Sequence, residues 1–245
     1  MIQPTFEQFI NNKEKYGRCA SWAIWKIGAS EQQRFAPKPT PNSRHFLNSF
    51  VLDLNKIENA IQFNQFAKLI HTEIVLVALN FAKRDDTPDD EIEDFVFGAF
   101  HEETSTTSDH RLRDACLGTP LWGGYITDLV KFKDGKISPV RDSNSNNISK
   151  LLRNQDFLNE QIDGLCTELS ELGCKNPTIV ALGNAVFDAL VNKNDGLPKK
   201  KILESLGNNT RLVRITHYSK ATGISHHNYV AKVYQELNHQ SIIRN

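Results

Sequence analysis

The segment that decides the fold is Leu212–Val230, LVRITHYSKATGISHHNYV. A short apolar run, which includes Val213 and Ile215, ends in the polar residues Thr216–Ser219, and a helical pattern begins again after a glycine-containing loop. Such an order is typical of a buried strand, a loop and a helix. In an open parallel α/β sheet, the loops that follow the carboxyl ends of the strands hold the ligand. We therefore expect His217 and its neighbours to lie at a binding edge.

Three other stretches have the same form, a run of strand formers that ends in polar groups: Ile74–Asn80, Gly124–Asp128 and Thr178–Leu182. Ile74–Leu79 is continuously apolar, as a strand covered on both faces should be. Helical patterns separate these strands, most clearly at Asp156–Leu172. Alternating strands and helices indicate a parallel sheet with right-handed crossovers. The sequence therefore predicts a three-layer α/β/α fold around a central, mainly four-stranded parallel sheet.

The length of 245 residues fits a single α/β domain, residues 1–245. We divide it into an N-terminal extension, residues 1–70, and a core, residues 71–240. The elements predicted in the extension are a helix at Thr5–Lys15, a strand within Cys19–Ile27, and a second strand at Phe50–Leu54 that would pair with the first in a hairpin-like edge. In the core, Asn192–Lys201 is predicted as a basic loop before one helical turn at Ile202–Leu206.

Composition argues against several classes of protein. Lysine plus arginine equals aspartate plus glutamate at 29 each, whereas a non-specific nucleic-acid binder is usually basic. No apolar run approaches the roughly 20 residues of a membrane helix, and the N-terminus lacks the order of a signal peptide. The four cysteines are scattered, with no C-x-x-C pair, which argues against metal or iron–sulfur ligation and favours the cytoplasm. We expect no membrane partner, no metal and no cofactor.

Four motifs follow one another in a particular order. They are VALNFAK at Val77–Lys83, GYITDLVKF at Gly124–Phe132, PTIVALGNAVFDAL at Pro177–Leu190 and THYS at Thr216–Ser219. Together they resemble the uracil-DNA glycosylase superfamily. In that family the first motif's loop holds the hydrolytic water in some branches, an Asn in the second reads the uracil edge, and the His-Pro-Ser loop matching the fourth enters the minor groove and supports the leaving base.

The resemblance implies a uracil-DNA-glycosylase-like protein that hydrolyses the N-glycosidic bond of a flipped base in DNA or a nucleotide. His217 would stabilise the departing base, and Asn80 would orient the attacking water, so both are candidate catalytic residues. The other candidates are the base-binding residues Asp128, Phe97 and Phe100, and the nucleic-acid-binding residues Tyr218, Ser219, Lys83 and Arg211. Lys83 is also the nearby amine that a Schiff base would need.

The sequence departs from the family pattern at several positions. Phe81 and Ala82 stand where the family has Pro and Gly, and Tyr218 replaces the Pro of the fourth motif. Asp128 replaces the Asn that reads uracil. An amide offers a donor and an acceptor, whereas an ionised carboxylate only accepts. We therefore expect uracil to be disfavoured and a base edge with adjacent donors, such as that of guanine, to fit better.

Each candidate also has an ordinary structural interpretation. These are a turn former for Asn80, a helix cap or a partner of Lys131 or Arg141 for Asp128, a hydrogen-bonded structural residue for His217, and core residues for Phe97 and Phe100. For the whole protein, the alternative function is a non-catalytic protein of the same fold that binds a nucleobase, a nucleotide or single-stranded nucleic acid. A third interpretation is an unrelated doubly wound enzyme or interaction module.

Overall fold

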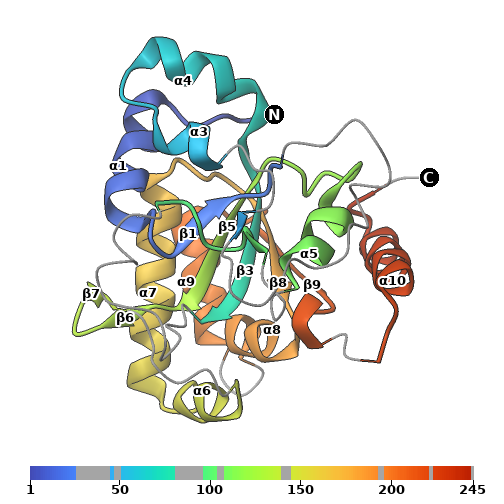
Figure 1. Ribbon diagram of the computed structural model, residues 1–245. Helices are drawn as coiled ribbons and strands as arrows, with labels where there is room; N and C mark the ends of the chain where they lie inside the picture. Colours follow the sequence, from blue (N-terminus) through green and yellow to red (C-terminus); the bar gives the residue numbers. More distant parts are fainter. Residues whose placement is uncertain are drawn as a thin grey trace.

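A five-stranded sheet in the order β1-β5-β3-β8-β9 forms the centre of the molecule (Figure 1). The computed structural model describes residues 1–25, 45–46, 51–80, 96–103, 108–138, 145–192, 196–220 and 223–243. The sheet strands are β1 (Ala20–Trp22), β3 (His71–Asn80), β5 (Gly124–Val130), β8 (Thr178–Leu182) and β9 (Arg211–Ile215). The last four are mutually parallel, and β1 is antiparallel to β5 at one edge. The predicted parallel sheet is confirmed, with β1 added as a fifth strand.

Helices cover both faces of the sheet. The first face carries α1 (Phe6–Tyr16), α7 (Gln155–Glu171) and α9 (Leu197–Leu206), on the left in Figure 1. The opposite face carries α5 (Asp109–Cys116) and α10 (His226–His239), on the right. The remaining elements are β2 (His45–Phe46), α3 (Val51–Asn55), α4 (Ala60–Phe66), η1 (Ala67–Leu69), β4 (Glu102–Glu103), β6 (Phe132–Lys133), β7 (Lys136–Ile137), α6 (Ser145–Leu151), α8 (Asn184–Val191) and η3 (Tyr218–Lys220). The arrangement is the three-layer α/β/α fold that the sequence predicts.

The helices begin where local chemistry favours it. At α1, the side chain of Thr5 accepts a hydrogen bond from the Gln8 backbone, and the Gln8 side chain accepts one from the Thr5 backbone. This capping box satisfies two amide groups that the first turn leaves without partners. At α7, the side chain of Asn154 caps the helix by accepting a hydrogen bond from the amide of Phe157. Both helices were predicted from sequence, and both are confirmed.

Two predicted elements are wrong. The segment predicted as a strand at Phe50–Leu54 contains the helix α3. A short apolar run has no clear period, so a strand and a buried helical turn look alike in sequence. The segment predicted as a basic loop at Asn192–Lys201 contains the first half of α9, in whose first turn Pro198 lies. Proline is compatible with the start of a helix because the amide it lacks would have no intrahelical partner there.

The N-terminal extension and the sheet share one hydrophobic core. Phe9 of α1 and Trp22 of β1 are fully buried in the same cluster as Leu129 of β5 and Leu165 of α7. The edge strand β1 takes the place of the predicted hairpin, and residues 26–27 of the predicted strand lie outside the described part of the chain. In the ranges that the structure describes, no helix has the length and apolar character needed to cross a bilayer.

Candidate functional site

Asp128 and Asn80 lie on neighbouring strands at the carboxyl edge of the sheet. Asp128 of β5 is directly opposite Ala78 of β3, and Asn80 follows Ala78 by two residues. Residues two apart in a strand point to the same face, and Ala78 belongs to the core beneath α5 and α10. The side chain of Asn80 therefore lies on the α5/α10 face, one step nearer the rim than Asp128. The Nδ2 atom of Asn80 is buried and has no hydrogen-bond partner among the described residues.

His217 lies at the same edge, in the loop after β9. Thr216 holds the start of this loop, because its amide and hydroxyl groups donate to the carboxylate of Glu236 on α10 at 2.7 and 2.6 Å. The amide of Ser219 donates to Nδ1 of His217 at 3.1 Å, and the Ser219 hydroxyl lies 2.8 Å from the same atom. Since Nδ1 accepts a hydrogen bond, the neutral imidazole carries its proton on Nε2. The loop therefore fixes His217 as a hydrogen-bond donor through Nε2.

Tyr218 connects this loop to the other side of the site. Its ring stacks on that of His217, with centroids 4.5 Å apart and an angle of 18° between the planes. Its hydroxyl group is hydrogen-bonded to Asp109 at the start of α5, and burial together with the nearby carboxylates of Asp109 and Asp128 raises the pKa of the phenol well above its usual value. Strands β5 and β9 are separated by three strand spacings, roughly 14 Å. Tyr218 thus joins the His217 loop to Asp109 of α5 and lies near enough to Asp128 for the two charges to interact.

Gly183 provides the close approach between β8 and the His217 loop. Its φ of 98° lies in a region that L-amino acids with a side chain rarely adopt, and a Cβ atom at this position would lie 3.2 Å from Cβ of His217. The Gly183 amide donates to the carbonyl of Ile215 at 2.8 Å. A glycine here lets the turn that begins α8 pack directly beneath the imidazole.

A buried charged network supports β5 from the opposite face. Lys131 and Glu168 are both fully buried, and the Lys131 ammonium contacts the Glu168 carboxylate and the hydroxyl of Thr127. Hydroxyl groups of Tyr125 and Thr127 donate to Oε1 of Glu168 at 2.7 and 2.8 Å, and Asn12 donates to the Tyr125 hydroxyl at 2.7 Å. The network therefore joins α1, β5 and α7 and satisfies both charges of the ion pair.

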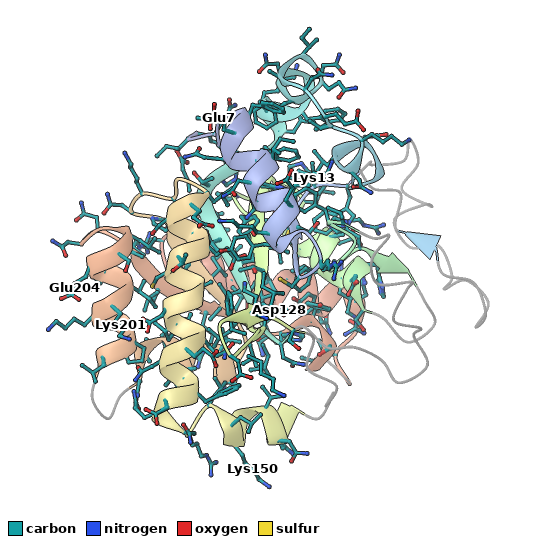
Figure 2. All side chains as sticks on the ribbon, turned by 90° about the vertical axis from the view of Figure 1, so that its left-hand side faces the viewer. Glu7, Lys13, Asp128, Lys150, Lys201 and Glu204 are labelled. Carbon is teal, nitrogen blue, oxygen red and sulfur yellow. The ribbon has the colours of Figure 1, made fainter. Side chains whose placement is uncertain are left out.

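Asp128 has no comparable support. Its side chain is 4% exposed, and among the described residues none donates a hydrogen bond to its carboxyl group. Figure 2 shows it in the interior, whereas Lys150, Lys201 and Glu204 project at the periphery. Burial raises the pKa of Asp128 to about 7; the positive charge of Lys131 opposes this shift, and the negative charge of Glu168 adds to it. At neutral pH the carboxyl group is therefore partly protonated.

A second polar cluster fixes α10 against α5. Asp114 of α5 accepts hydrogen bonds from Arg113 at 2.7 Å and from Nε2 of His226 at 2.8 Å, and the His226 ring stacks on that of His110. Burial alone would raise the pKa of Asp114, but these two donors outweigh it and hold the pKa below its usual value. The cluster orients α5, which carries Asp109, and α10, which follows the His217 loop.

The other two base-binding candidates, Phe97 and Phe100, pack on opposite faces of the sheet. Phe97 is fully buried in the core on the α7 face, with its ring 5.6 Å from that of Phe9, so it is a core residue and the prediction that it stacks on a base is wrong. Phe100 is half-buried against the core on the α5/α10 face, which is the face of the site. Its role as a base-binding residue stays a prediction.

The nucleic-acid-binding candidates separate in space. Tyr218 and Ser219 lie at the site, and Lys83 lies outside the described residues, as does Arg141. Arg211 is the first residue of β9, at the opposite edge of the sheet, where its guanidinium group donates to the carbonyl oxygens of Gln240 and Ser241 after α10. Arg211 therefore lies at the edge of the sheet opposite His217 and caps a helix, and its role as a nucleic-acid-binding residue stays a prediction.

Sequence reasoning missed Asp109, Glu168 and the true partner of Lys131. Glu168 had a recognisable signal, because it lies on the apolar stripe of α7 three residues after Leu165, and a charge on such a stripe requires a buried partner. Asp109 had a weaker one, as an acidic residue in the first turn of a helix. The open alternative that pairs Lys131 with Asp128 is not what is found, since the ammonium contacts Glu168.

The structure also contains a cavity away from this edge. A cavity of about 430 Å³ lies at the opposite, amino edge of the sheet, lined by residues that include His71, Pro120 and Trp122. We place the candidate site at the carboxyl edge because polar groups that end or follow three of the strands lie along it. Within the described ranges, no group of three or more His, Cys, Asp or Glu side chains has the geometry to hold a metal ion. Comparisons with known protein families, with curated proteins and with solved structures give no match to this chain.

Proposed function

We propose that the carboxyl edge of the sheet binds a nucleobase flipped from DNA, or the base of a nucleotide, and that the protein hydrolyses the N-glycosidic bond in the manner of uracil-DNA glycosylases. The fold would then be a uracil-DNA-glycosylase-like form of the three-layer architecture. The proposal rests chiefly on His217, whose Nδ1 atom accepts from Ser219 and whose Nε2 atom carries the proton. A leaving base gains negative charge as the bond breaks, and a fixed donor aimed at that charge stabilises the transition state.

The topology supports a ligand at this edge. The chain leaves β3 for β5 on one side of it and later returns to β8 on the other side. Ligands in open parallel sheets bind at such a reversal of strand order, outside the carboxyl ends. Asn80 ends β3 at this point, and its unpartnered amide suits contact with a water molecule or a ligand oxygen. In the proposed reaction Asn80 positions the attacking water.

The alternative function is recognition without cleavage, and one observation favours it. An amide is a weak general base, and the carboxyl groups that the described residues place at this edge are the buried Asp128 and Asp109, the second of which is bound to Tyr218. A protein of this kind would bind a base without activating water. For both functions we propose a cytoplasmic location, in keeping with the four cysteines, which are buried and unpaired.

The test is incubation with single-stranded oligonucleotides that each carry one altered base, followed by alkaline cleavage. Strand scission is expected for at least one base, with a loss of about 10²-fold or more in His217→Ala and in Asn80→Ala. His239→Ala, at the far end of α10, is the matched control and should retain activity. Binding without scission would establish the alternative function, and scission unaffected by both site variants would contradict the assigned roles.

A further inference from the structure

The buried charges near the end of β5 do not balance. Two carboxyl groups, Asp128 and Glu168, accompany one ammonium group, Lys131, and all three side chains are at most 4% exposed. The ammonium group lies on the α7 face of the strand, where it contacts Glu168 and Thr127. A buried ion pair of this kind is neutral as a unit. Among the described residues, the charge of Asp128 is therefore left without a bonded counterion.

The groups that face Asp128 from other elements, in the part of the chain that the structure describes, do not supply one. They are Lys131 after β5, Glu168 of α7, the thiol of Cys19 before β1 and the phenol of Tyr218 in η3. The Tyr218 hydroxyl is engaged with Asp109, and the thiol carries no positive charge. A buried carboxyl group without a bonded cation or a donor becomes neutral by taking a proton. The elevated pKa of Asp128 agrees with this charge count.

We propose that Asp128 reads its ligand as a neutral carboxylic acid, with one oxygen donating and the other accepting. This inference rests on the proposed function and names the class of ligand: a base edge with one donor and one acceptor side by side, as in uracil or cytosine. The ionised carboxylate reads only an edge with adjacent donors, such as that of guanine. The proton on Asp128 thus selects the ligand. Binding of a donor–acceptor edge requires Asp128 to keep that proton.

The first measurement needs no ligand. The side-chain carboxyl carbon of Asp128 is followed by NMR in the full chain as the pH is raised, with Asp128→Asn used to assign the signal. A titration midpoint near 7 is expected. A carboxyl group that is ionised throughout the range above about pH 5 would overturn the inference, whatever the protein binds.

The second measurement is binding of free uridine and of free guanosine between about pH 5.5 and about pH 8. Above the midpoint, uridine affinity should fall by up to about tenfold per pH unit, whereas guanosine affinity should not, because its N1–H and N2 amino group suit the ionised carboxylate. In Asp128→Asn this difference between the two nucleosides should disappear. Because each nucleoside is compared with itself across pH, the difference in their size does not affect the result.

The outcomes separate the two proposals. Nucleoside binding without any change of preference across this pH range would overturn the inference and leave the proposed function standing. Absence of binding to every nucleoside and oligonucleotide would overturn the proposed function and, with it, the reading role of Asp128, even with a carboxyl group that titrates near 7.

Discussion

Replacing Lys131 by Met should destabilise the protein strongly, because it removes the one cation that neutralises Glu168. Both side chains are fully buried, so solvent cannot replace the lost ammonium group. Removal of one partner from a buried ion pair typically costs 3–5 kcal/mol. Glu168 keeps the hydrogen bonds from Tyr125 and Thr127. We therefore expect a cost at the low end, about 3 kcal/mol, which corresponds to a fall in melting temperature of about 6–12 °C for a chain of this size.

The second variant in the series tests whether charge is the cause. Lys131→Met combined with Glu168→Gln leaves no charge at these two positions, and the glutamine oxygen still accepts from the hydroxyl groups of Tyr125 and Thr127. The double variant should therefore be more stable than Lys131→Met by about 2 kcal/mol, a coupling typical of residues in direct contact. In Lys131→Met the pKa of Asp128 should rise further, since the lost Lys131 charge is the factor that opposes this rise.

The assay is urea unfolding at fixed pH, followed by circular dichroism and analysed for the midpoint and slope. Lys199→Met, on the exposed side of α9, is the control and should change stability by less than about 0.5 kcal/mol. A similarly small effect of Lys131→Met, or a double variant no more stable than the single one, would refute the reasoning that the pair is a buried, charge-balanced unit.

Two other predictions concern the Gly183 turn and a buried histidine. Gly183→Ala should cost about 1–3 kcal/mol of stability, because φ is 98° and the added methyl would lie 3.2 Å from Cβ of His217. The displaced His217 should reduce nucleoside affinity. Gly196→Ala is the control, since φ there is 66° and a Cβ atom would have no neighbour within 4 Å, and it should leave binding intact. His101 is fully buried and burial lowers its pKa to about 3, so the unfolded chain takes up a proton near pH 6.5 that the folded protein refuses, and stability falls as the pH decreases from 6.5 toward 3. His101→Gln keeps a side-chain donor for the carbonyl of Trp22 and should remove that part of the pH dependence of unfolding; an unchanged slope between these pH values would count against a neutral buried imidazole.

Much of the fold follows from patterns that are local in the sequence. The strand predicted at Thr178–Leu182 has those bounds in the structure, and α7 begins one residue before its predicted start. A continuously apolar run flanked by turn residues and an amphipathic run preceded by a capping Asn are both decided within a few residues. The wrong predictions, at α3 and the first half of α9, fall where local signals conflict. One is a run too short to show a period, and the other is a turn in which a buried proline precedes three lysines.

The site was predictable only in part, because its polar partners are distant in the chain. That Asn80, Asp128 and His217 share one edge follows from parallel strands. The contact between Tyr218 and Asp109 joins residues about a hundred positions apart, and no spacing rule links them. The position of Arg211 at the start of β9, away from His217, follows from the direction of the strand and not from its charge. The protonation of Asp128 depends on which carboxylate Lys131 contacts, and only three-dimensional packing determines that contact.

The antiparallel edge strand has a consequence for how the protein is made. Ala20 of β1 pairs with Thr127 of β5, about a hundred residues later in the chain. At translation rates of roughly 5–20 residues per second, the first strand leaves the ribosome on the order of 5–20 s before its partner exists. During that interval Trp22, which ends up fully buried, lacks Tyr125 of β5, whose ring lies 5.1 Å from its own in the folded protein. The segment that contains β1 is thus a stretch of this polypeptide that a chaperone acting during synthesis has time to bind.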